Sequence, residues 1–546
     1  MRKLTLAHRL RRKIRSRDSF YHPQHQRYKW LVLANVMIGT FMAVLDATIV
    51  NVGLPKIMAS FGVSLDTIEW VITAYMLAMA VMLPTSNWLA DRFGYKLVYF
   101  MGLLTFTLGS FLCGMATNET FLILARVLQG LGAGCLMPVG MAIVTREFPT
   151  RQRGLALGFW SIAAAASVSF GPLIGGYLVD NFNWPLIFDV NVPVGAFGLL
   201  VTILVQREYK NPNARSFDMV GFVSAIIFLP SILYALSQGN ASTNSEGWSN
   251  PVILLLFAVS AISLTVFIVN ELNVEHPMID LRMMKDPNFG LGNLIIFLFG
   301  MGMFGSTFLL PMYLQQSMGY TALQSGSVFL PVGILQGTMA PLSGIFSDKI
   351  NPRVPVILGI LLLALSFWIN GFLSYLSERS FIMISLYIRG FAMGILFTPL
   401  STLALVGVKR EKMGQASGIM NVIRQLGGSF GVAVFSTILT SRIIFHSVNY
   451  SQNIELNNPL YQNISKTMTQ HAIHDAGSNA ATAAMQSRIM VASYVSQQAY
   501  IEGIDDDFKV ACLITLLCGV PIFFLRRKAK DTAKEMGKPV QPDPGK

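Results

Sequence analysis

Charged side chains are scarce in this sequence. Asp, Glu, Lys and Arg together make up 13% of its 546 residues, whereas 53% are hydrophobic, and the mean hydropathy is +0.53. A soluble globular protein carries about a quarter charged residues. The shortage argues against a soluble enzyme, a disordered scaffold and a secreted disulfide protein. It predicts an all-α polytopic membrane protein.

Cysteine and histidine are also few, and their positions carry no chemistry. The four cysteines, Cys113, Cys135, Cys512 and Cys518, all lie inside apolar segments, where cysteine behaves as a small hydrophobic residue. None of the seven histidines lies inside an apolar run. We therefore predict no disulfide, no metal site and no cofactor. No nucleophile–base pattern is visible in the apolar segments, which argues against an enzyme.

Long hydrophobic runs are abundant. A spanning helix needs about 20 mostly apolar residues, and fourteen runs reach this length. They are 30–51, 68–88, 97–116, 120–142, 153–178, 186–206, 216–237, 251–270, 289–315, 323–346, 354–374, 380–407, 414–441 and 506–525. The polar segment 442–505 is then a long loop, with a short helix expected around 478–500.

Lys and Arg are distributed unequally between the two sides of the membrane that this count defines. Residues 1–29, with the basic segment Arg9–Arg17, and the tail after 526 lie on one side together with most of the basic loops. The other side carries only Lys56, Arg379, Arg442, Lys466 and Arg488. Under the positive-inside rule both termini lie in the cytoplasm. The basic N-terminus is predicted to contact anionic lipid rather than nucleic acid.

Two short stretches repeat each other. Pro84 to Arg92 closes the second run and Pro341 to Lys349 closes the tenth, and each has a serine two residues after its proline and an acid–base pair at its end. Arg126 in the fourth run and Arg389 in the twelfth are separated by nearly the same number of residues as these two stretches. Two six-helix bundles around a central cavity, with two helices inserted between them, are therefore predicted, which is a transporter architecture. The predicted division is 1–29 basic N-terminus, 30–206 first bundle, 207–288 insert, 289–526 second bundle and 527–546 tail.

Ionisable residues inside a spanning segment are costly and therefore informative, about 2.5–3.5 kcal/mol each on insertion scales. Asp46 is the only acid well inside a run, and Arg126 lies at a similar depth, roughly 8–9 Å from the same surface. We expect the two to pair and to face the central cavity. Burial favours a neutral carboxyl and a guanidinium favours an ionised one. Such a carboxyl suits proton exchange, and a static pair that fixes helix packing is the alternative.

Further cavity candidates follow from position alone. Arg389 and Arg424 lie deeper in their runs, and no acid is expected in runs nine to fourteen to pair with them. They could bind backbone carbonyls, line water or meet an anionic group of a substrate. The other candidates are Gln315, Gln316, Gln336, Trp160 and Phe304.

Several segments resemble one known family, in order along nearly the whole chain. Leu45-Asp46-Ala-Thr48 through Pro55 resembles the first-helix motif of the fourteen-helix drug/proton antiporters of the major facilitator superfamily, the EmrB/QacA type. The other resembling segments are Leu89 to Lys96 for the loop after helix two, Arg126 to Gly132 for helix four, Gly171-Pro172-Leu-Ile-Gly175-Gly176 for helix five, Asn191 to Gly195, and Arg424 to Gly428.

The resemblance assigns roles to residues of this chain. It implies proton handling by Asp46 and Arg126, and closure of the interface between the bundles by Gly171, Pro172, Gly175 and Gly176. It implies cytoplasmic gating by Asp91, Arg92 and Gly94, with Asp348 as the repeat counterpart of Asp91. The loop motif departs from the family pattern at Asn87, where Gly is usual, and at Tyr95, where Arg is usual, which puts the tightness of this gate in doubt.

The sequence therefore predicts proton-coupled efflux of amphipathic or lipophilic small molecules by alternating access, driven by the proton gradient, in a bacterial inner membrane. Two alternatives stay open. One is export of an endogenous lipid, fatty acid, siderophore or metabolite, and the other is a sensor or scaffold with a transporter fold and no flux. Substrate, protons and membrane lipids are the expected partners, and no accessory export protein is identified by the sequence.

Overall fold

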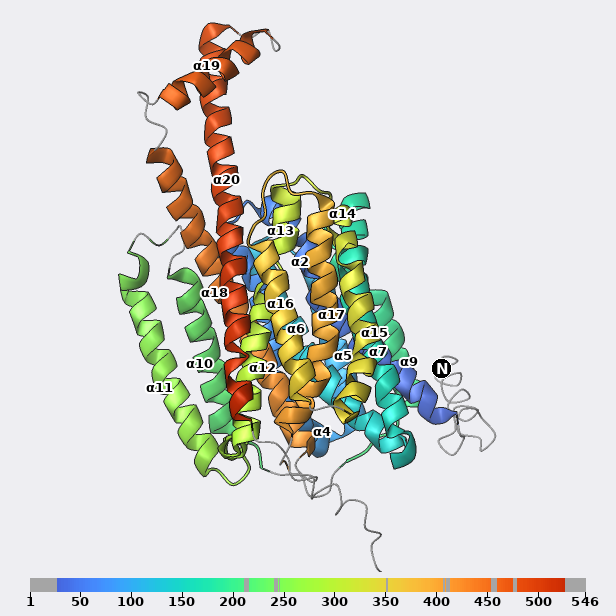
Figure 1. Cartoon of the computed structure of the whole chain (residues 1–546). Coiled ribbons are helices and arrows are strands. Elements are labelled where there is room, and N and C mark those ends of the chain that lie inside the picture. Colours follow the sequence, from blue (N-terminus) through green and yellow to red (C-terminus); the bar gives the residue numbers. More distant parts are fainter. Residues whose placement is uncertain are drawn as a thin grey trace, which may run out of the picture.

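The structure, a computed structural model, describes residues 27–210, 216–239, 244, 246–349, 352–405, 408, 413–452, 459–474 and 479–525. In these residues it is helical throughout, with short connecting loops and no strand. The helices run alongside one another, and the first described helix, α2 (Tyr28–Phe61), begins at the same end of the molecule at which the last long helix, α20 (Ala480–Leu517), ends (Figure 1). We call this the terminal end and the opposite one the α19 end. The predicted all-α class is confirmed.

The described residues of the first half form eight helices. They are α2 (Tyr28–Phe61), α3 (Leu65–Ile68), α4 (Trp70–Phe93), α5 (Tyr95–Gly114), α6 (Glu119–Glu147), α7 (Thr150–Asn181), α8 (Leu186–Asp189) and α9 (Asn191–Val205). Two helices follow as the insert, α10 (Met219–Gln238) and α11 (Pro251–Asn273). They pack against each other, and α10 also contacts α4 and α18.

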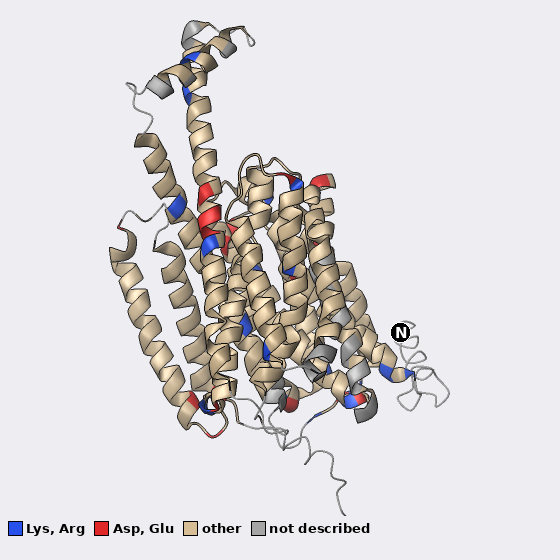
Figure 2. Cartoon of the chain, in the orientation of Figure 1, with Lys and Arg blue, Asp and Glu red and all other residues tan. Residues whose placement is uncertain are grey.

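The second half contains the remaining helices. They are α12 (Pro287–Gly305), α13 (Leu309–Gln316), α14 (Ala322–Val328), α15 (Leu330–Lys349), α16 (Arg353–Asn370), α17 (Arg379–Ala404), α18 (Met413–Gln452), α19 (Pro459–His474) and α20 (Ala480–Leu517). Short 3-10 segments lie at Gly247–Ser249, Leu281–Lys285 and Val520–Phe524. Lys and Arg, Asp and Glu are sparse along the middle of the helices (Figure 2).

Twelve of the helical segments in the described residues are long and apolar enough to cross a membrane. The two predicted runs that are not among them, 153–178 and 323–346, are also helical, as α7 and as α14 with α15. These helices pack against each other across the two halves. A helix covered by protein on one side needs a less apolar surface than one surrounded by lipid, so the predicted fourteen spans are compatible with the structure.

The polar segment 442–505 is more helical than expected. Helix α18 extends to Gln452 and α20 begins at Ala480, so that both continue beyond the rest of the bundle, where α19 lies next to α20 (Figure 1). The expected short helix around 478–500 is the first part of α20. The last run therefore does not begin at 506, and the acids Asp505, Asp506 and Asp507 lie within a continuous helix.

The two halves are in close contact at the α19 end. A Cβ added at Gly176 would collide with the backbone of Ala322, and one at Gly326 would collide with the carbonyl of Pro172. Asp180 at the end of α7 accepts hydrogen bonds from the backbone N–H groups of Ala322, at 3.0 Å, and Leu323, at 2.6 Å. The glycines let the backbones approach, so this end is closed.

A larger side chain at Gly176 should open the α19 end. We expect Gly176→Val to separate α7 from α14, because its side chain has no room beside Ala322. Spin labels on Phe182→Cys and Leu376→Cys, two exposed positions in different halves, would report a longer distance. Gly418→Val is the control, since an added Cβ there meets nothing within 4 Å. An unchanged distance in Gly176→Val would show that this contact does not hold the end closed.

Candidate functional site

Asp46 on α2 and Arg126 on α6 form an ion pair inside the first half. Nη1 of Arg126 donates to Oδ2 of Asp46. The two side chains are 0% and 1% exposed. Charges taken out of water are tolerated when they are paired and their remaining hydrogen-bonding atoms are satisfied. The pair that the sequence suggested is therefore present, and it is deeply buried.

Three neutral side chains complete the pair. Oδ1 of Asp46 accepts from the amides of Gln129, at 2.7 Å, and Asn191, at 3.1 Å. Both amides also donate to the hydroxyl of Ser110, at 3.0 and 3.1 Å, and this hydroxyl donates to the carbonyl of Phe188 at 2.8 Å. Gln129 and Asn191 lie in the segments Arg126 to Gly132 and Asn191 to Gly195 that resemble the family, but neither was expected to bond to Asp46. Ser110 belongs to none of these segments, and no pattern in the amino-acid sequence indicated its contact with the two amides.

Arg126 also ties α6 to α4. Its Nε donates to the carbonyl of Val71 at 2.8 Å, and its guanidinium lies 4.0 Å from the centre of the Tyr75 ring. The Tyr75 hydroxyl in turn donates to the carbonyl of Ala43 on α2 at 2.9 Å. Cation–π contact of this kind stabilises a desolvated guanidinium by about 2 kcal/mol. The network therefore joins α2, α4, α5, α6, α8 and α9.

The expectation that the pair faces a cavity between the bundles is not met in this structure. All residues that contact it belong to the first half, and it is enclosed by them. The oxygens of the Asp46 carboxyl are occupied by the guanidinium of Arg126 and by the two amides. Exchange of a proton at Asp46 would therefore require the pair to open.

Helix α2 links this network to the other half. Thr48, two residues after Asp46, donates to the carbonyl of Ser167 on α7 at 3.3 Å. A Cβ added at Gly171 of α7 would collide with the hydroxyl of Thr48. One turn further, the carbonyl of Val52 accepts from the amide of Gln315 on α13 at 2.9 Å. A movement of α2 would thus reach both the glycine-rich helix and the second half.

The loop motif after α4 forms contacts within the first half. Asp91 accepts from the Tyr95 hydroxyl at 2.8 Å and lies 4.0 Å from the guanidinium of Arg146. The guanidinium of Arg146 stacks 4.0 Å from the centre of the Tyr95 ring. Tyr95, the departure from the family pattern, therefore bridges Asp91 and Arg146.

Other members of the gating set differ in their surroundings. Gly94, with φ of 114°, adopts a backbone conformation that favours glycine, and it packs against the Glu208 carboxylate. Arg92 is exposed. Asp348 lies on α15, and its side chain falls outside the described residues.

Arg389 and Arg424 differ from Arg126 because neither is paired with an acid in the described residues. Nε of Arg389 is 3.4 Å from the Ser366 hydroxyl, its guanidinium lies 4.8 Å from the Phe367 ring, and its Nη2 has no hydrogen-bond partner. The guanidinium of Arg424 lies 5.0 Å from the Phe397 ring.

The expectation that no acid lies within runs nine to fourteen is wrong. Asp507 on α20 is 0% exposed, and neither of its carboxyl oxygens has a hydrogen-bond partner. Its neighbours are accounted for: Asp506 pairs with Arg442 at 2.6 Å, and Asp505 accepts from the Leu373 N–H at 3.0 Å. The expectation failed because the start of the last span was placed one residue before Asp507.

The remaining cavity candidates do not gather in one place. Trp160 donates to Thr40 at 2.8 Å within the first half, whereas Gln315 belongs to the closed contact at the α19 end. Phe304 packs next to Gly428, where Met76 of α4 also lies, at the interface between the halves. Gln336 is on α15 facing Gly394 of α17, and Gln316 is exposed.

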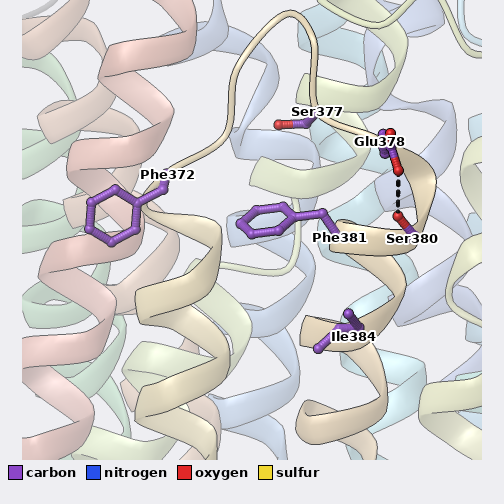
Figure 3. Close-up of a pocket in the computed structure, with 6 residues that line it drawn as sticks. All are labelled: Phe372, Ser377, Glu378, Ser380, Phe381 and Ile384. Carbon is purple, nitrogen blue, oxygen red and sulfur yellow. Dashed lines mark hydrogen bonds between the residues drawn. The ribbon is translucent and has the colours of Figure 1, made fainter.

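A surface hollow lies apart from all of these groups. Figure 3 shows it between the end of α16 and the start of α17, where Glu378 accepts from Ser380 at 3.0 Å. The lining side chains are Phe372, Ser377, Glu378, Ser380, Phe381 and Ile384. It is open and lies at the α19 end, and we assign it no role.

Comparison with known proteins places the chain in a family. Residues 36–432 match the model of the Major Facilitator Superfamily. The chain is 32% identical to the uncharacterized MFS-type transporter YhcA of Bacillus subtilis over 93% of its length and 94% of the relative's. It is 30% identical to the multidrug export protein EmrB of Haemophilus influenzae, with coverage of 91% and 95%.

A solved structure has the same fold. A bacterial homolog of the human lysosomal transporter Spinster superposes with a TM-score of 0.62 at 17% identity, and the match covers 92% of this chain and 97% of that one. At this identity the likeness concerns the fold alone.

Breaking one side of the ion pair should cost more than neutralising both. We expect Arg126→Met to lower the free energy of unfolding by about 3–5 kcal/mol, because the Asp46 carboxylate is then buried without its counter-charge. Asp46→Asn combined with Arg126→Met should be less destabilising, because Asn keeps an acceptor for Gln129 and Asn191. Thermal unfolding in detergent, followed by tryptophan fluorescence, compares the two. Equal stability of Arg126→Met and the wild type would contradict this account of the pair.

Proposed function

The chain belongs to the major facilitator superfamily, and from this premise we propose that it exports amphipathic or lipophilic small molecules across a bacterial inner membrane in exchange for protons. That it is a multi-pass membrane transporter follows from the family and from its apolar helices. The direction, the substrate class and the proton coupling are the proposal. Support for the substrate class comes from the multidrug export relatives, including EmrB of Escherichia coli K12, 33% identical over 77% of this chain.

The orientation in the membrane is part of the proposal. The terminal end is assigned to the cytoplasm, because α2 begins and the described chain ends there, and in the sequence basic segments precede the one and follow the other, whereas the α19 end has few Lys and Arg residues. The α19 end is then the outer side. The structure, closed at this end, would represent a state from which the substrate is not released outward.

The coupling rests on the position of Asp46 on α2. Protonation of this carboxyl would weaken its bond to Arg126 and to the two amides, leaving α2 free to shift against α6. Thr48 and Val52 lie on the same helix and contact α7 and α13. A shift of α2 would therefore loosen the closure at the α19 end. This connection along one helix is the observation that carries the proposal.

The free energy that one proton gains on crossing the membrane is large enough to drive such a conformational change. One proton that moves inward gains about 2.3 kcal/mol per 100 mV of membrane potential, in addition to any pH difference. A step of this size shifts an equilibrium between two conformations by nearly two powers of ten.

Replacing the carboxyl should abolish coupled export. We expect Asp46→Asn in proteoliposomes to lose accumulation of ethidium against its gradient when a pH difference is imposed, because Asn cannot bind and release a proton. Asp189→Asn is the matched control, since Asp189 is a partly exposed acid on α8 that is not bonded to Arg126.

The readout separates coupling from transport. The wild type should move protons together with ethidium, and a protonophore should abolish the accumulation. If Asp46→Asn still accumulates ethidium and still moves protons, Asp46 is a structural residue and the exchange site lies elsewhere.

A further inference from the structure

Glu69 is a buried acid for which the mechanism above has no use. It precedes α4 near the α19 end and is 1% exposed. One of its carboxyl oxygens accepts from the hydroxyl of Ser237 on α10, and the other, Oε2, has no hydrogen-bond partner. In the part of the chain that the structure describes, no Lys, Arg or His is paired with it.

The carboxyl lies where three parts of the molecule meet. Glu69 belongs to the first half, Ser237 to the insert and Ser436, which lies beside the carboxyl without completing a hydrogen bond, to the second half. The junction is held by further contacts: Thr440 of α18 donates to Asp66 at 2.8 Å, and Thr437 donates to the carbonyl of Leu236 at 2.9 Å. A movement between the halves would change the surroundings of Glu69.

Two residues close to Glu69 in the chain also have buried polar atoms without partners. Besides Oε2 of Glu69, the indole N–H of Trp70 and the hydroxyl of Thr73 are buried without a hydrogen bond. Thr73 is one turn from Glu69 on the same face of the helix. A buried polar group without a partner costs about 1–3 kcal/mol. These unpartnered atoms, one of them on a carboxyl without a counter-charge, can each gain a bond from a polar ligand.

The aromatic surface beside it suits an organic ligand. The Trp70 ring lies 5.8 Å from the ring of Tyr234 on α10, and Leu77, Leu233 and Ala433 continue the apolar surface between α4, α10 and α18. An aromatic face with a carboxylate is the combination that binds an organic cation. The inference rests on the proposed function, because a binding site near the outer side is expected in a protein that exports such molecules.

We propose that Glu69 is the anionic anchor of a binding site for organic cations at the junction of α4, α10 and α18, and that a proton occupies the carboxyl when no cation is bound. The site gives the insert a direct part in binding, through Ser237. It is separate from Asp46, which is enclosed in its own network within the first half.

Other ionisable groups near the junction do not replace Glu69. Asp66 on α3 is bonded to Thr440, and the ring of Tyr234 on α10 packs against the tilted ring of Trp70. On α18, Arg442 and His446 pair with Asp506 of α20. Lys56 on α2 is exposed. Binding of a cation should therefore follow the titration of Glu69.

Equilibrium binding to the purified full-length protein tests the site without any gradient. The probes are radiolabelled tetraphenylphosphonium, a permanent cation, and Nile red, which is uncharged. In the wild type the affinity for tetraphenylphosphonium should rise with pH as the proton leaves the carboxyl. Glu69→Gln should lower this affinity at high pH at least about tenfold and remove its pH dependence, with Nile red binding unchanged.

Two further variants keep the result interpretable. Glu246→Gln makes the same change at an exposed acid of the insert and should bind both probes as the wild type does. Ser237→Ala retains the carboxyl but removes a donor to its ionised form, so the pH midpoint of tetraphenylphosphonium binding should move upward. This variant answers the question if Glu69→Gln does not fold.

The outcomes distinguish the site from the export function. Wild-type affinity and pH dependence in Glu69→Gln, or an unchanged midpoint in Ser237→Ala, overturns the site. A wild type that binds tetraphenylphosphonium as expected but accumulates no ethidium in proteoliposomes supports the site and contradicts the proposed export.

Discussion

A charge buried among helices is costly unless it is partnered, and the first half of this transporter is arranged around one such charge pair. Asp46 and Arg126 are buried between helices, and the cost of burying their charges is offset by an ion pair, two amides and an aromatic ring. The partners come from six helices, so the pair also fixes how those helices pack. Any change in the charge of Asp46 therefore changes the packing of the whole half.

The two halves handle their charges differently. In the first half the acid and the base meet, whereas in the second half Arg389 has an unpartnered nitrogen and Asp507 has two unpartnered oxygens. Glu69 lies at the junction of both halves and the insert. The ion pair of the first half is thus satisfied in this state, whereas Glu69 and the second half retain groups that can still gain partners. This asymmetry fits a molecule that alternates between two arrangements.

Much of the architecture could be predicted from the sequence, because hydrophobic length and the placement of Lys and Arg are governed by the bilayer. The Asp46–Arg126 pair could be predicted from depth. Three features could not. The contact of Ser110 depends on how α5 packs against α6. The burial of Asp507 could not be predicted because polar residues precede it in the long helix α20, so the sequence resembles a loop there. The role of Glu69 depends on its contact with Ser237, which is far away in the chain. Tertiary packing determines each of these three features, and the spacing of hydrophobic residues along the sequence carries no information about it.

The central claim is that the Asp46 carboxyl changes its protonation when the transporter changes conformation. Infrared difference spectroscopy measures this directly on purified protein, by comparing the Gly176→Val variant, held open at the α19 end, with the wild type at one pH. The account predicts the band of a protonated carboxyl in the open form that is missing when Asp46→Asn is introduced into the same variant. An identical band with and without Asp46, or no such band, would contradict it.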